Sequence, residues 1–96
     1  MIAYTMLGTN DLERAGAFYD ALLMPLGAKR LFDGGDKIGW GRDRSDPLFI
    51  VTTPLDGQPA TAGNGTMIAF GLKDSAQIEE THARALALGA RDEGTP

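Results

Sequence analysis

The chain passes from a strand to a helix within the stretch Tyr4-Thr5-Met6-Leu7-Gly8-Thr9-Asn10-Asp11-Leu12-Glu13-Arg14-Ala15. Residues 2–7 are apolar and β-forming and stop at Gly8, which predicts a strand. Asn10 is a suitable N-cap, and Glu13 stands three positions later, where it can reach back to the cap. Apolar residues then recur at helical spacing, which predicts a helix that Pro25 and Gly27 end.

Three short strands and a linker are expected after this helix. The strands cover 28–32, 37–42 and 48–53. Asp33-Gly34-Gly35-Asp36 predicts a hairpin turn between the first two, because glycine tolerates positive φ. Residues 54–65 are rich in Pro, Gly, Asp, Asn and small side chains without periodicity, which is typical of a linker.

The same order of elements returns after the linker. A strand is expected over 66–72, followed by an N-cap at Asp74 with Gln77 three residues later, and by a helix to about Leu88. The first helix ends in Leu26-Gly27-Ala28-Lys29 and the second in Leu88-Gly89-Ala90-Arg91. These matched endings favour an internal duplication. The alternative is that any two strand–helix units look alike, since glycine commonly follows a helix.

The sequence therefore predicts an α+β fold of paired βαβββ modules in a single domain over 1–96. The first module covers about 1–53, the linker 54–65 and the start of the second module 66–96. By analogy with the first module, the second lacks three strands. Either the chain is a fragment, or a partner supplies those strands, because a half-finished sheet leaves an exposed edge.

Composition excludes several classes of function. The 96 residues carry a net charge of −4 with both signs scattered, which argues against partnership with nucleic acid or an anionic membrane. No segment is long and apolar enough to span a bilayer, and no signal peptide is evident. The absence of cysteine excludes disulfides, thiolate catalysis and cysteine-bound zinc. We expect a soluble cytoplasmic protein.

The order and spacing of these elements resemble a known family. The stretch from Tyr4 to Ala15, followed by Phe18-Tyr19 and Leu26-Gly27, resembles the opening of the glyoxalase/bleomycin-resistance/extradiol-dioxygenase superfamily, also called the vicinal oxygen chelate superfamily. Asn64-Gly65-Thr66-Met67-Ile68-Ala69-Phe70 resembles the strand that opens its second module. The resemblance implies two βαβββ modules that curl around a cavity, often in a homodimer.

The resemblance also implies where a divalent metal would be held, and this chain does not match those positions. The family's His, Glu or Gln ligands correspond to Tyr4 on the first strand, to about Ile50 on the fourth and to Met67 in the second module, and the last ligand would lie beyond Pro96. Isoleucine cannot ligate a metal, and methionine suits only soft metals. We therefore expect no metal cofactor.

Strand alternation selects a candidate ligand-binding set. With Tyr4, Ile50 and Met67 facing the cavity, Met6 and Trp40 join them, and Arg42 lies at the mouth. The set is Tyr4, Met6, Trp40, Arg42, Ile50 and Met67. Such an apolar, aromatic lining suits a small apolar or planar molecule. The alternative is that these side chains only fill the space between two sheets.

Other signals favour structural roles. His82 is the single histidine and is expected at the edge of the core. Gly39 and Gly41 are interpreted as strand glycines that make room opposite the Trp40 face, and not as a phosphate loop, because no Gly-Lys-Ser/Thr follows.

Three functions remain open. The first is a small-molecule binding protein of the glyoxalase/bleomycin-resistance fold without a catalytic metal, which the unmatched ligand positions favour.

 The second is a lyase or oxidoreductase related to glyoxalase or the dioxygenases, so whether the chain is an enzyme stays open, although the unmatched positions argue against metal-dependent catalysis. The third is an interaction module whose partner completes the sheet. Fold alone does not decide among them.

Overall fold

The computed structural model describes residues 2–43, 45–61 and 66–91. The chain forms two compact units, Met1–Asn64 and Gly65–Pro96. The end of the predicted linker, 62–65, lies outside the described residues. The first unit contains β1 (Tyr4–Gly8), α1 (Leu12–Leu23), a 3₁₀ turn η1 (Met24–Leu26), β2 (Lys29–Asp33), β3 (Lys37–Gly41) and β4 (Leu48–Thr52), and the second contains α2 (Ser75–Ala87).

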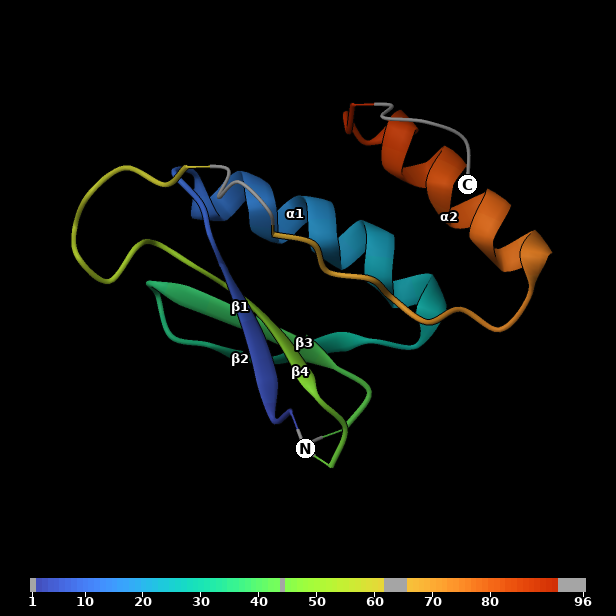
Figure 1. The fold of residues 1–96 in the computed structure, drawn as a ribbon, viewed down its shortest axis with the longest axis horizontal. Coiled ribbons are helices and arrows are strands. Elements are labelled where there is room, and N and C mark those ends of the chain that lie inside the picture. Colours follow the sequence, from blue (N-terminus) through green and yellow to red (C-terminus); the bar gives the residue numbers. More distant parts are fainter. Residues whose placement is uncertain (1, 44, 62–65, 92–96) are drawn as a thin grey trace. The chain divides into compact units, whose positions relative to one another are not determined.

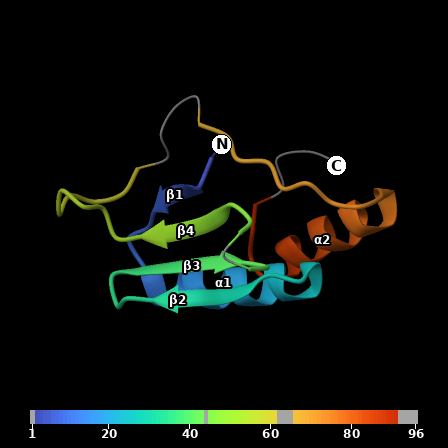
Figure 2. The same cartoon turned by 90° about the horizontal axis from the view of Figure 1, so that it is seen from below.

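The first unit has the predicted βαβββ order. Its four strands form one sheet in the order β1-β4-β3-β2. β1 and β4 run parallel, while β4, β3 and β2 are antiparallel to their neighbours. Helix α1 lies on one face of this sheet (Figures 1 and 2). The buried apolar core is made by Leu22, Leu23, Ile38, Trp40, Phe49, Ile50 and Val51.

The N-cap of α1 differs from the expectation by one residue. Asp11 is the cap, and its carboxylate accepts a hydrogen bond from the backbone N–H of Arg14 at 3.1 Å. The prediction of Asn10 was wrong because both residue types cap helices well and the local pattern does not separate neighbours. The end of the helical segment was predicted correctly, since Gly27 follows η1 with φ of +90°.

In the second unit, the predicted strand over 66–72 is absent. These residues have no regular secondary structure, and Met67 is 89% exposed. A strand requires a neighbour that satisfies its backbone hydrogen bonds, and no described segment pairs with this one. The chain thus contains one complete βαβββ module and the incomplete beginning of a second.

Helix α2 follows the expected pattern at both ends. Asp74 accepts a hydrogen bond from the N–H of Gln77 at 2.8 Å, and the Gln77 side chain accepts one from the N–H of Lys73 at 2.9 Å. Gly89 ends the segment with φ of +107°, as Gly27 does in the first unit. None of the described helices is long and apolar enough to cross a membrane.

Candidate ligand-binding face

The register of the strands assigns side chains to the two faces of the sheet. Neighbours in register share a face, and successive residues alternate. Met6 lies beside Ile50, and Ile50 lies beside Gly39. Phe49, the residue before Ile50, faces the other way and packs against Tyr19 of α1, with 4.8 Å between ring centroids. Met6, Ile50 and Gly39 therefore lie on the face opposite α1, which we call the open face.

Three rows of residues cross the open face. From β1 to β2 they are Tyr4, Leu48, Gly41 and Lys29; then Met6, Ile50, Gly39 and Phe32; then Gly8, Thr52, Lys37 and Gly34. Ile50 in the centre is 5% exposed, whereas Tyr4 at the edge is 54% exposed. A molecule that approaches this face would contact the side chains around Ile50 more than Ile50 itself.

Two glycines of β3 bring neighbouring side chains down onto the backbone. A Cβ atom at Gly39 would lie 2.4 Å from the Phe32 ring. At Gly41 it would lie 2.9 Å from Leu48 and 3.2 Å from Leu31. The distances of 2.4 Å and 2.9 Å are too short for a real Cβ, so both positions require glycine or a shift of the neighbours. This confirms the interpretation that the strand glycines make room for other side chains.

The linker borders the open face at the end of β1. A Cβ atom at Gly8 would lie 3.4 Å from Cβ of Ala60 and 3.6 Å from Cγ of Pro54. The Asn10 side chain donates a hydrogen bond to the Ala60 carbonyl at 3.2 Å and accepts one from the Ala60 N–H at 2.6 Å. Asn10 thus holds the linker beside the strand instead of capping α1.

The open face unites half of the candidate binding residues. Tyr4, Met6 and Ile50 lie together on it. Arg42 lies in the loop after β3, where it forms an ion pair with Asp46 at 3.3 Å. Met67 belongs to the second unit. Whether any of these residues binds a ligand stays a prediction.

The expected position of Trp40 was wrong. Trp40 lies on the α1 face and is 1% exposed, with its ring centroid 5.6 Å from that of Tyr19. Alternation divides a strand into two sets of side chains but does not say which set meets the helix. Here the bulky residues Ile38 and Trp40 meet α1, while Gly39 between them and Gly41 after them face the open side.

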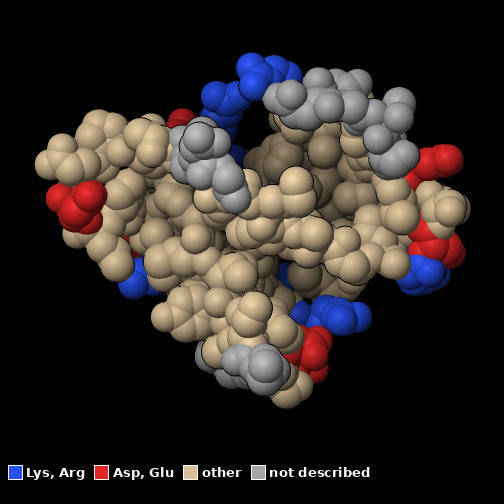
Figure 3. Space-filling view, in the orientation of Figure 1, with Lys and Arg blue, Asp and Glu red and all other residues tan. Residues whose placement is uncertain are grey.

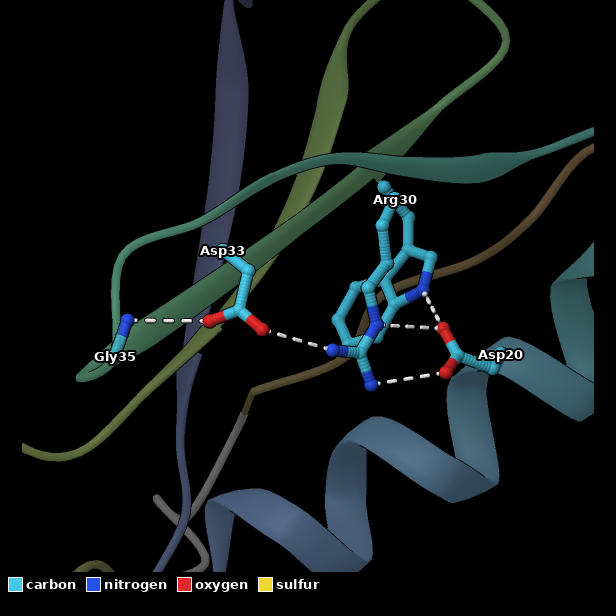
Figure 4. A network of polar contacts seen from close by, with 5 residues as sticks. Asp20, Arg30, Asp33 and Gly35 are labelled. Carbon is cyan, nitrogen blue, oxygen red and sulfur yellow. Dashed lines mark hydrogen bonds and ion pairs between the residues drawn. The ribbon is translucent and has the colours of Figure 1, made fainter.

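A polar network holds Trp40 against α1 (Figure 4). Asp20 accepts hydrogen bonds from Nε and Nη2 of Arg30, each at 2.9 Å, and from Nε1 of Trp40, also at 2.9 Å. Arg30 donates a further bond to Asp33 at 3.0 Å. The Arg30 guanidinium also lies 5.9 Å from the Trp40 ring centroid. Gly16 leaves space for Arg30, because a Cβ there would lie 2.7 Å from Nη2.

This network shifts the pKa of its carboxylate. The hydrogen bond from Arg30 lowers the pKa of Asp20, burial raises it by a smaller amount, and the hydrogen bond from Trp40 lowers it further. The sequence analysis missed the network. A signal for it exists, since Asp20 stands four residues after Gly16 and one after Tyr19, on the side of α1 that meets the sheet. The network ties α1 to β2 and β3 and does not reach the open face.

The residues of the open face do not fit a divalent metal. The strand positions on this face carry aliphatic, aromatic, hydroxyl and ammonium groups and no His, Asp or Glu. Over residues 2–43, 45–61 and 66–91, no three such residues cluster as metal ligands. Tyr4, which corresponds to a ligand of the resembled family, offers only a phenol. Imidazole suits nickel, zinc and iron, and carboxylate suits manganese, and the strand positions of the open face supply neither group.

Two solved structures are similar to this chain. One is a glyoxalase/bleomycin resistance protein from Albidiferax ferrireducens T118, at 37% sequence identity and a TM-score of 0.83, and the match covers 93% of this chain and 70% of that one. The other is lactoylglutathione lyase from Agrobacterium tumefaciens, at 24% identity and a TM-score of 0.62, covering 98% and 74%. The second likeness concerns the fold alone. No family model and no curated protein matches the sequence.

Proposed function

The chain belongs to the glyoxalase/bleomycin resistance protein family, and we propose that it binds a small apolar or planar molecule on the open face without a catalytic metal. The observation that carries this proposal is the chemistry of the open face. Its central side chains are Met6, Leu48, Ile50 and Phe32, all apolar, and no imidazole or carboxylate stands among the strand positions there.

The packing of apolar side chains on the open face supports binding through apolar contact. Gly39 and Gly41 let Phe32 and Leu48 approach the backbone of β3 closely. Apolar side chains next to one another on the face favour an apolar molecule, which gains free energy by removing apolar surface from water. The phenol of Tyr4 makes no hydrogen bond with the described residues and is 54% exposed. It can therefore donate a hydrogen bond to a ligand.

The alternative of a metal-dependent lyase or oxidoreductase lacks a comparable observation. It requires ligands that the open face does not supply. The likeness to a lyase at 24% identity concerns the fold alone.

Titration with the fluorescent neutral probe N-phenyl-1-naphthylamine tests the proposal. We expect saturable binding that Tyr4→Ala weakens about 3- to 10-fold, because the ring of Tyr4 would no longer cover the probe. Met24→Ala is the matched control, since Met24 is 65% exposed on η1 and lies away from the open face. Equal loss in both variants, or no saturable binding at all, would contradict the proposal.

We further propose that two copies associate and act in the cytoplasm. The second unit exposes several large apolar side chains, namely Met67, Phe70, Ile78, Leu86 and Leu88. Exposed apolar groups of this kind are typical of an interaction surface. Sedimentation equilibrium checks the dimer, which predicts twice the 10.2 kDa mass of one chain. A chain that stays monomeric at micromolar concentration would contradict it.

A further inference from the structure

The open face carries positive charge in a protein whose net charge is negative. The chain has 13 acidic and 9 basic residues, which give a net charge of −4. Two lysines nevertheless stand on the open face, Lys29 in the row of Gly41 and Lys37 in the row of Thr52. No acidic residue occupies a strand position on this face, because Asp33 lies beside Ile38 on the α1 face.

Neither lysine forms an ion pair with a described residue, and the carboxylate nearby at the start of β3 is that of Asp36, whose Oδ1 lies 3.6 Å from the Cβ position of Gly34, with Lys37 Cγ at 3.9 Å from the same position. Among the described residues, no carboxylate lies within ion-pair distance of Lys29 or Lys37. By contrast, Arg30 and Arg42 are both paired with aspartates. Figure 3 shows that charged groups of both signs are scattered over the visible surface.

The two lysines lie on either side of the central row of the open face, Met6, Ile50, Gly39 and Phe32, which we call the apolar row. They are separated by the length of β3 from Lys37 to Gly41, about 13 Å at the rise of a strand. Lys29 is exposed, whereas Lys37 is half-buried beside Thr52. A half-buried lysine side chain is already partly held by its neighbours, so it loses less conformational entropy on pairing than an exposed one. Lys37 is therefore the better placed of the two to pair with an anionic group.

We propose that the open face selects an organic anion with an apolar or planar body, whose acid group pairs with Lys37 while the body covers Met6, Ile50 and Phe32. This inference rests on the proposed function and adds the charge of the ligand to it. The pairing would be a charge-assisted hydrogen bond from the ammonium to a carboxylate or sulfonate oxygen.

A matched pair of probes tests the charge. 8-Anilino-1-naphthalenesulfonate and N-phenyl-1-naphthylamine share one aromatic body, and only the first carries an anionic group. We expect Lys37→Gln to weaken binding of the sulfonate about 2- to 5-fold, which is the size of effect expected for a partly exposed ion pair. The same substitution should leave the affinity for the neutral probe unchanged. Lys37→Arg should keep the affinity for the sulfonate. Lys73→Gln is the control, because Lys73 is an exposed lysine of the second unit.

The outcomes separate this inference from the proposed function. If neither probe binds the unaltered protein, the proposed function fails. If both bind, but Lys37→Gln weakens neither or weakens both equally, the charge selection is wrong and the proposed function stands. Circular dichroism and the Tm of each variant establish that it is folded. Weaker sulfonate binding at higher salt, with the neutral probe unaffected, would give independent support.

Discussion

Gly39 determines how closely the Phe32 ring approaches the sheet. Because a Cβ at this position would lie 2.4 Å from the ring, Gly39→Ala should lower the free energy of unfolding by about 1–3 kcal/mol. The cost should largely disappear in a Phe32→Ala background, and urea denaturation of the four proteins of this double-mutant cycle measures the difference. Gly71→Ala is the control, because a Cβ there meets nothing within 4 Å. Additive effects of the two substitutions would show that the contact does not exist.

Asp20 makes stability depend on pH in the acidic range. The Arg30 hydrogen bond lowers the folded-state pKa of Asp20 below its unfolded value. The carboxylate therefore stabilises the fold above the unfolded pKa of about 3.9, and this contribution is lost as the pH falls through the folded pKa. Asp20→Asn should cost about 1 kcal/mol or less at pH 7, since the pair is partly exposed.

Urea denaturation of both proteins between pH 7 and pH 2 measures this dependence. The unaltered protein should lose its advantage over Asp20→Asn as the pH falls below about 4. A constant difference in unfolding free energy across the range would contradict the role of the ion pair.

At the scale of elements, two neighbouring side chains at the start of α1 have different roles, since Asp11 caps the helix and Asn10 binds the linker. Asp11→Ala removes the N-cap and should lower the free energy of unfolding by about 1 kcal/mol. Asn10→Ala should leave the helix intact but release the linker, because the Asn10 amide makes both hydrogen bonds to Ala60. Hydrogen exchange should therefore become faster at the Ala60 N–H in Asn10→Ala. Faster exchange at Ala60 in Asp11→Ala alone would reverse this assignment.

Local patterns predicted most elements of the first unit to within one or two residues. Strands, turns and helix ends depend on neighbouring residues, as the Asp33-Gly34-Gly35-Asp36 hairpin and the turn at Gly27 illustrate. The cap was misplaced because a contact across 50 residues with Ala60 occupies Asn10. The strand at 66–72 was predicted from its composition, but a strand also needs a partner, which composition does not reveal.

At the scale of the molecule, the candidate site was only partly predictable. Strand periodicity grouped Met6 with Tyr4 correctly, because residues two apart share a face, and Ile50 was added to them from the family resemblance. It did not show which side of β3 meets α1, so Trp40 was placed on the wrong face. The lysines of the open face went unnoticed, since their meeting with the apolar row depends on strand register and not on sequence spacing.

The central claim is that the open face binds an apolar ligand without a metal. The most direct test measures the Kd of N-phenyl-1-naphthylamine for protein treated with a chelator, and again after addition of nickel, zinc, manganese or iron(II). We predict one unchanged Kd in all of these conditions and no stoichiometric metal in the purified protein. Binding that disappears with the chelator and returns with about one metal ion per chain would contradict the claim, because the ligand would then depend on a metal centre.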